Sequence, residues 1–220
     1  MEPVIALFSA GGIVMIPLLL LSLASITLIL ERLLFWIKIA RRQPAIVREV
    51  LQTFQTRPSD AQALLAQNVD LPIARILLTP LELPRNLAAR LSPAGFRLAL
   101  ESATQRELPL LRRFNTVFDI VISVSPLLGL LGTVLGLIQS FSSLQISNPT
   151  ASNATGIAAG ISEALVSTVM GMAIAIVTLI FANVFRGLYR RQLALIQQYG
   201  SQLELLYLCR FQSKSVGAPR

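Results

Sequence analysis

Three long apolar stretches divide the chain, and each is long enough to cross a bilayer as a helix, which takes about 20 residues. The first begins at Phe8, and up to Leu30 its only polar side chains are Ser and Thr. The other two come from residues 120–162 and beyond, an uncharged run that a Ser/Thr/Asn-rich segment interrupts. The pattern therefore predicts an all-α integral membrane protein with three transmembrane helices at residues 8–36, 117–142 and 157–185.

Charge on the flanking segments predicts how the spans are oriented. Between Lys38 and Arg113 there are twelve Lys and Arg against six Asp and Glu, and after Phe185 there are six against one. Lys and Arg accumulate in cytoplasmic segments close to span ends. We therefore expect the N-terminal tail (1–7) and the short loop (143–156) outside, and the long middle segment (37–116) and the C-terminal segment (186–220) in the cytoplasm.

The cytoplasmic segments are expected to be helical, because no alternating strand pattern of useful length occurs in them. Ser59-Asp60 and Ser92-Pro93 are typical of helix N-termini. The third span is expected to continue as one long helix beyond Phe185, with Gly200 as its weak point. Prolines start or break helices, and here they are expected to partition the middle segment at Pro44, Pro58, Pro72, Pro80, Pro84, Pro93 and Pro109.

Small and hydroxyl-bearing residues follow one helical face of the second and third spans, at a spacing of mostly three or four. One interpretation is close helix packing, for which small residues are suited. The other is that the hydroxyls of this face line a water-filled pore. The packing candidates are Gly129, Gly132, Gly136, Gly160 and Gly171.

Thr133 and Thr168 are the candidate pore hydroxyls. At 1.5 Å per residue they lie roughly 20 Å and 27 Å from the inner edge of the membrane, at comparable levels in its outer half. Glu163 is the only acid between Asp119 and Glu204. It is predicted near the outer interface, where it is a proton-pathway or partner-contact candidate, although an acid in the first turn of a helix is also favoured by the dipole.

Composition limits the chemistry that this chain performs alone. It is 54% hydrophobic and 14% charged, has a net charge of +8, a single Cys209 and no histidine. These counts exclude histidine-dependent hydrolysis and CxxC sites, so we expect no enzyme, no metal site and no cofactor. The basic residues are too scattered to predict nucleic-acid binding. No acid or base lies at mid-membrane depth, so proton conduction requires a titratable group from a second protein.

Two segments resemble the signatures of a known family. Residues 125–136, SPLLGLLGTVLG, followed by Phe141, resemble the second-span signature of the ExbB branch of the MotA/TolQ/ExbB proton-channel family. Residues 160–172, GISEALVSTVMGM, resemble the third-span signature. Chain length, the three spans and Glu31-Arg32 at the end of the first span also match, while the middle segment is only generically similar.

The resemblance implies a homopentameric subunit of the bacterial inner membrane, with a periplasmic N-terminus and a cytoplasmic C-terminus. Its second and third spans would form the walls of a pore around an ExbD-like single-span partner, whose membrane Asp would titrate. Proton-motive force would then energise TonB-dependent outer-membrane transport through a TonB-like protein. The family's pore threonines map onto Thr133 and Thr168, and its span glutamate maps onto Glu163.

Two alternatives remain open at this point. The TolQ branch, which serves the Tol envelope-maintenance motor, shares both signatures, whereas the flagellar stator branch has four spans and is disfavoured. A non-conducting membrane scaffold would use the small-residue faces for packing alone. An intramembrane enzyme would need a Ser/Lys or Asp pair within the bilayer, which the sequence does not contain.

Overall fold

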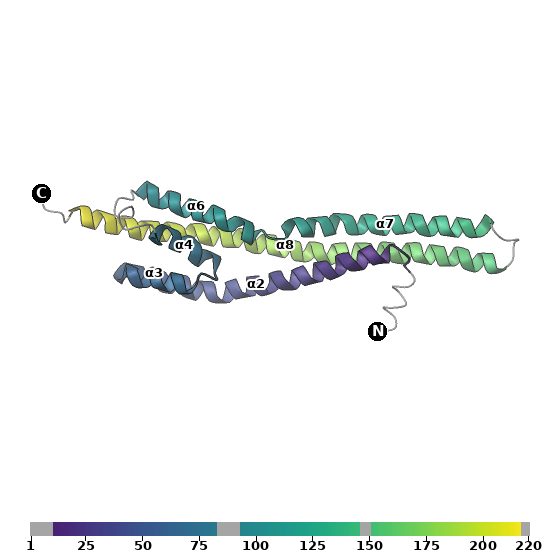
Figure 1. Ribbon diagram of the computed structural model, residues 1–220, viewed down its shortest axis with the longest axis horizontal. Helices are drawn as coiled ribbons and strands as arrows, with labels where there is room; N and C mark the ends of the chain where they lie inside the picture. Colours follow the sequence, from purple (N-terminus) through teal and green to yellow (C-terminus); the bar gives the residue numbers. More distant parts are fainter. Residues whose placement is uncertain (1–10, 83–92, 146–150, 217–220) are drawn as a thin grey trace. The chain divides into compact units, whose positions relative to one another are not determined.

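The structure is a computed structural model that describes residues 11–82, 93–145 and 151–216, and in these ranges it contains helices and no strand. Three helical stretches in them are long and apolar enough to span a membrane: Met15–Thr56, Ala94–Ser142 and Gly156–Cys209. The all-α, three-span architecture is thus confirmed. The helices, shown in Figure 1, are α2 (Met15–Thr56), α3 (Pro58–Gln67), α4 (Pro72–Glu82), α6 (Pro93–Leu111), α7 (Asn115–Gln145) and α8 (Ala151–Val216).

The first helix begins later and runs further than the sequence pattern predicts. Residues 11–14 form a turn, and α2 begins at Met15 instead of Phe8. It then continues to Thr56 through Pro44. The prediction that Pro44 and Pro109 break helices is wrong, as it is for Pro80, because all three lie inside helices. A proline frees the carbonyl four residues earlier; for Pro44 and Pro109 that residue is exposed, so water can bond the freed carbonyl.

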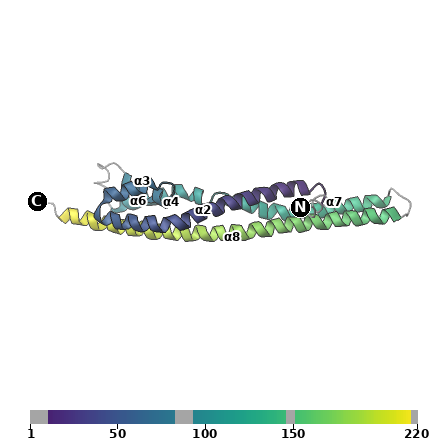
Figure 2. The ribbon, with the colours of Figure 1, turned by 90° about the horizontal axis from the view of Figure 1, so that it is seen from below.

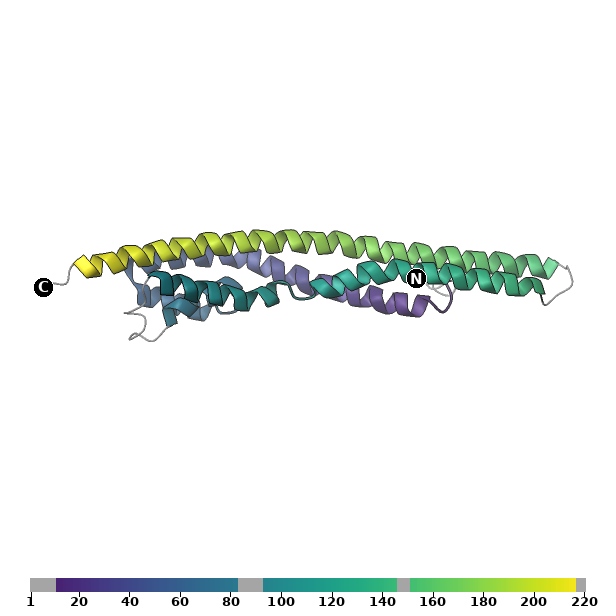
Figure 3. The same cartoon turned by 90° about the horizontal axis from the view of Figure 1, so that it is seen from above.

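Other helix boundaries differ by a few residues. The N-cap of α3 is Arg57, in an extended conformation, with Pro58 as the first helical residue and Asp60 in the first turn. Pro93 begins α6, as Pro72 begins α4. The predicted tail 1–7, Ser92, Pro84 and residues 146–150 of the predicted loop lie outside the described residues. Helix α8 continues without interruption past Gly200, as expected, and Figures 2 and 3 show it as a single helix.

The chain divides into two compact units. The membrane unit consists of Met1–Arg32 and Phe114–Phe185, and the charged unit consists of Leu33–Arg113 and Arg186–Arg220. Helices α2 and α8 therefore contribute to both units, whereas α7 belongs to the membrane unit and α3, α4 and α6 belong to the charged unit.

In the membrane unit, α7 and the first half of α8 run side by side, and the beginning of α2 packs against them (Figure 1). A small apolar core joins the three helices. Its members are Val14, Met15 and Leu18 of the first span, with Leu128, Met170 and Ile174 packed against them. Apolar side chains on the outside of this unit, such as Leu127 and Ile176, are 62% and 58% exposed, as expected for a lipid-facing surface.

The charged unit has a core of large apolar side chains and a set of ion pairs. Helix α4 is almost entirely buried and packs against α3 and α6. Arg75 of α4 makes a bidentate pair with Glu107 of α6, with N–O distances of 2.8 and 2.7 Å. Asp70, in the turn before α4, pairs with Lys38 at 3.0 Å and also with Arg42 of α2. The hydrogen bond from Lys38, helped by the charges of Lys38 and Arg42, holds the pKa of Asp70 below its ordinary value.

Candidate functional site

Helices α7 and α8 approach each other closely along the five predicted packing glycines, which we call the glycine seam: Gly129, Gly132, Gly136, Gly160 and Gly171. A Cβ atom on Gly136 would lie 2.6 Å from the carbonyl oxygen of Gly160. One on Gly171 would lie 2.5 Å from the carbonyl oxygen of Ser125. Real Cβ atoms do not approach backbone oxygens so closely, and backbone cannot move aside as a flexible side chain can. At Gly136, Gly160 and Gly171 the seam is therefore a backbone-to-backbone contact that requires glycine.

Thr168 lies at this seam and connects the two helices. Its Oγ1 donates a hydrogen bond to the carbonyl oxygen of Gly129, at 3.0 Å. The neighbouring Ser167, which is fully buried, donates to the carbonyl of Ala164 at 2.9 Å and contacts the Gly129 carbonyl at 3.4 Å. Both bonds use the hydroxyl hydrogen, so each oxygen keeps lone pairs with which to accept a further hydrogen bond.

Thr133 lies on α7, about one helical turn from Gly129. Its Oγ1 donates to the carbonyl of Leu130 at 2.7 Å, and the residue is half-buried. Because Thr168 is opposite Gly129 and Thr133 is four residues further along α7, the two hydroxyls are offset by about 6 Å along the helix axis. The structure thus places the threonines on neighbouring helices, about one turn apart along the helix axis.

Glu163 is half-buried, and its carboxylate lies directly against Gly12. Gly12 has a positive φ of 67°, and its carbonyl accepts the first backbone hydrogen bond of the turn into α2, from the amide of Met15 at 3.1 Å. The carboxylate therefore lies close to the N-terminal end of α2, which carries partial positive charge. The positive φ of Gly12 favours glycine at this position, and a Cβ there would displace the Glu163 carboxylate.

The first span is fixed to α8 by a second hydroxyl contact. Ser25 and Thr178 share a buried hydrogen bond of 2.7 Å, and Thr178 also donates to the carbonyl of Ile174 at 2.7 Å. At the beginning of the first span, Val14 lies beside Gly132 of α7. From Gly132, α7 runs another 13 residues to Gln145, which is about 20 Å. The α7–α8 pair therefore extends well beyond the first residue of α2.

Sequence reasoning missed three residues of this region. Gly12 contacts Glu163, Ser25 bonds Thr178, and Arg32 is buried with only 3% of its surface exposed. The sequence did contain a signal for Gly12, because two adjacent glycines, Gly11 and Gly12, disfavour a helix at that point of the apolar run. Ser25 and Arg32 could not have been assigned, since their partners lie far away in the sequence.

The arrangement provides hydroxyls and one carboxylate. No cluster of three metal-ligating side chains occurs in the described part of the chain. From Ala164 to Phe185, the third span has no ionisable residue. Hydroxyls can relay hydrogen bonds but do not change charge near neutral pH. Glu163, at the start of this uncharged run, is therefore the one ionisable side chain among the candidate site residues.

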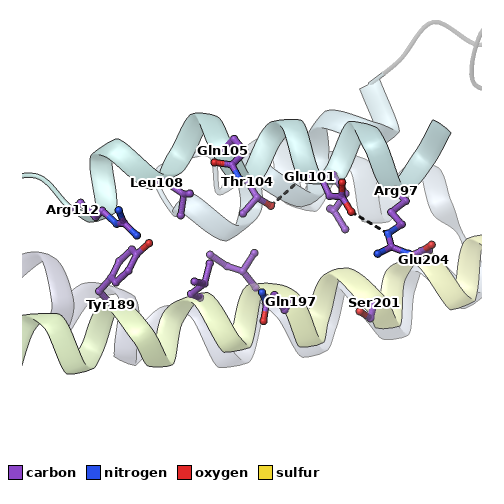
Figure 4. A pocket seen from close by; sticks show the side chains of 13 residues that line it. Arg97, Glu101, Thr104, Gln105, Leu108, Arg112, Tyr189, Gln197, Ser201 and Glu204 are labelled. Atoms are coloured by element: carbon purple, nitrogen blue, oxygen red, sulfur yellow. Dashed lines mark hydrogen bonds and ion pairs between the residues drawn. The ribbon is translucent and has the colours of Figure 1, made fainter. Parts of the chain in front are cut away.

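A separate groove lies in the charged unit, between α6 and α8 (Figure 4). It has a volume of about 620 Å³ and polar residues along both edges. Arg97 is paired with Glu101 at 3.0 Å at one end, and the Arg112 guanidinium lies over the ring of Tyr189 at the other. It contains none of the predicted site residues.

Fold and site together define a multi-pass membrane protein whose second and third spans form a glycine-packed, hydroxyl-bearing pair. Residues 68–198 match the MotA/TolQ/ExbB proton channel family. The chain is 58% identical to the biopolymer transport protein ExbB-like 3 of Synechocystis sp. over 198 residues, which cover 90% of this chain and 92% of the relative. It is 39% identical to ExbB-like 1 of the same organism, over 91% of this chain and 77% of the relative.

The chain therefore belongs to the MotA/TolQ/ExbB proton channel family. This confirms the family resemblance drawn from the two span signatures. Members of the family are membrane transport proteins that work as oligomeric complexes with partner proteins. The relatives named ExbB-like match across most of the chain. This match extends into the middle segment, which neither span signature covers.

Proposed function

We propose that this chain is an ExbB-like subunit of a proton channel and motor of the bacterial inner membrane. In this role it uses proton-motive force to energise TonB-dependent transport across the outer membrane. The observation that carries the proposal is the α7–α8 pair, in which Thr168 bridges to the Gly129 carbonyl and Thr133 lies one turn away. The similarity to two ExbB-like biopolymer transport proteins supports the choice of branch.

The subunit supplies the walls of the pore and a partner supplies the titratable group. Several copies, five by the resemblance, surround single-span helices of an ExbD-like protein that carry a membrane Asp, and a TonB-like protein receives the force. This division of labour follows from the third span, which has 22 uncharged residues between Glu163 and Arg186. Glu163, whose carboxylate lies near the N-terminal end of α2, is the one carboxylate that this chain contributes to the proton path.

Orientation follows from the distribution of arginine. The charged unit contains most of the Lys and Arg residues, and such segments stay in the cytoplasm. The N-terminus and the end of α7 would then lie in the periplasm, with Glu163 near the periplasmic surface.

The test uses the chain co-expressed with its single-span partner, with proton flux measured in vesicles and energised uptake measured in cells. Thr133→Val, Thr168→Val and Glu163→Gln keep the volume of each side chain and remove its hydroxyl or charge. We expect each to lower flux and uptake at least about tenfold while assembly with the partner persists. Thr27→Val is the matched control, because Thr27 is an exposed span threonine that bonds only its own helix, at Leu23.

A scaffold function is the second candidate, because the Thr168 hydroxyl donates within the subunit and the glycine seam by itself explains the α7–α8 contact. A scaffold predicts that the Thr→Val variants are silent while seam glycines stay sensitive to substitution. Normal flux in all three test variants would therefore overturn the channel proposal in favour of the scaffold. Restoration of uptake only with a Tol-system partner would instead indicate the TolQ branch.

A further inference from the structure

The chain turns between α6 and α7 at a residue with an unusual backbone conformation. Phe114 has a φ of 69°, and no other non-glycine residue in the described ranges has a positive φ. This left-handed conformation brings a Cβ atom too close to the backbone and is a genuine outlier for a bulky residue. Such strain persists only where surrounding structure imposes it, and it is found at functional positions.

The ring of Phe114 is covered by a buried cation. The guanidinium carbon of Arg32 lies 5.2 Å from the ring centroid, within the range of a cation–π interaction. Arg32 is 3% exposed, and its Nε lies 3.7 Å from the carboxylate of the adjacent Glu31. A cation–π interaction is stronger where water is excluded. The contact thus offers a specific reason for Phe114 to keep its unfavourable conformation.

The turn also defines the beginning of α7. The carbonyl of Phe114 accepts a hydrogen bond from the amide of Phe118, at 3.0 Å, which closes the first turn of the helix. Asn115, a residue type that adopts positive φ more readily, follows directly but is already inside α7. Local preference would place the turn at Asn115. Its position at Phe114 therefore points to the contact with Arg32.

We propose that Arg32 is a positioning residue that acts through the ring of Phe114 and thereby fixes where α7 begins. Arg32 belongs to α2, far away in the sequence, so its contact with Phe114 fixes the start of α7 relative to α2 at this end of the membrane unit. If the turn kept its place in the fold but used the next residue of the chain, every side chain on α7, including Thr133, would rotate by about 100°. That consequence for the pore rests on the proposed function, whereas the contact and its test do not.

Amide hydrogen exchange of the full-length chain in lipid nanodiscs tests the proposal, because it reports the opening of the first turn of α7. Arg32→Gln removes the cation, and we expect exchange at Phe118 to rise about tenfold. Arg32→Lys, which keeps the charge and loses the planar guanidinium, should recover part of the protection. Arg41→Gln is the matched control, since Arg41 is an exposed arginine of the same helix.

A double variant separates positioning through Phe114 from a general structural effect. Glycine adopts positive φ without strain, so Phe114→Gly should keep the turn without help from Arg32. We expect Arg32→Gln to change exchange at Phe118 less than about twofold in the Phe114→Gly background. An equal rise in both backgrounds, or no rise in either, would overturn the proposal.

A third variant keeps the proposal testable if Arg32→Gln does not fold. Phe114→Leu retains the Cβ atom and its strain but removes the aromatic face. Exchange at Phe118 should then be about tenfold faster than in Phe114→Gly. Equal protection in these two variants would show that the aromatic face has no part in holding the turn, and the proposal would fail. These readouts do not depend on transport, so they are distinct from a failure of the proposed function.

Discussion

Helix α8 uses one face in two different ways along its length. Within the membrane unit the buried positions of this face carry small residues, among them Gly160, Ala164, Ser167 and Gly171. Within the charged unit the same spacing continues, but the buried residues include Tyr189, Ile196 and Leu203. The helix geometry is constant, and only the side chains that fill the face change at the boundary.

The difference follows from the solvent around each unit. Lipid tails are as apolar as leucine, so burying leucine between spans gains little, and close backbone contact and hydrogen bonds hold the helices together instead. In water, burial of large apolar side chains drives packing. The charged unit accordingly buries Leu203 completely and adds ion pairs on its surface. Enlarging a buried residue should therefore destabilise the membrane unit most, whereas shrinking a buried residue should destabilise the charged unit most.

The largest effect is expected from enlarging a seam residue. Gly171→Leu would place a Cβ atom 2.5 Å from the Ser125 carbonyl, with backbone on both sides. We expect a loss of more than about 3 kcal/mol in the free energy of unfolding, measured by circular dichroism of the detergent-solubilised chain. Gly187→Leu is the control on the same helix, because nothing apart from the neighbouring backbone of α8 itself lies within 4 Å of its Cβ position; the stability of this variant should be unchanged or raised.

In the charged unit, shrinking a buried residue should lower the free energy of unfolding. Leu203 is 0% exposed, and Leu203→Ala should lower the free energy of unfolding by about 3 kcal/mol. Leu205→Ala, at a position that is 61% exposed, is the control and should leave it nearly unchanged. If both leucine variants had the same stability, the charged unit would not be held by its apolar core.

The same contrast explains what the sequence could and could not predict. The spans and the small-residue face of α8 follow from local patterns, because hydropathy and helical spacing are properties of neighbouring residues. The continuation of α2 through Pro44 does not, since it depends on whether the freed carbonyl at Ala40 reaches water. Pro44 alone predicts a helix break, but the exposed carbonyl of Ala40 can bond water, which removes the cost of its lost helical hydrogen bond.

The candidate site divides in the same manner. Thr168 and the seam glycines could be nominated from spacing, but the Gly129 carbonyl as the acceptor of Thr168 could not. Backbone carbonyls carry no sequence signal, and this one is 39 residues away. The contact of Glu163 with Gly12 is similarly non-local. What the sequence lacks is the pairing of distant backbone positions, which is how the membrane unit is held together.

Ion pairs in the charged unit should have effects that depend on burial. Glu107 is 12% exposed and accepts two hydrogen bonds from Arg75, so Glu107→Gln should lower the free energy of unfolding by about 1 kcal/mol. Glu101→Gln is the control, because the pair of Glu101 with Arg97 is exposed at 59% and 68% and should contribute nothing measurable. Equal losses in the two variants would show that burial does not decide the contribution.

The smallest effect is expected at Asp70, and only at low pH. Lys38 and Arg42 lower the pKa of Asp70 in the folded chain below its ordinary value of 3.8. A group with a depressed folded pKa stabilises the fold above its unfolded pKa and loses that contribution as the pH falls through the folded value. Thermal unfolding midpoints should therefore fall less steeply below about pH 4 in Asp70→Asn than in the unsubstituted chain. Lys38→Gln removes the main hydrogen-bond donor and should flatten the profile in the same direction. An unchanged slope in Asp70→Asn would mean that acid sensitivity arises at other carboxylates and that the turn before α4 is held by its apolar neighbours.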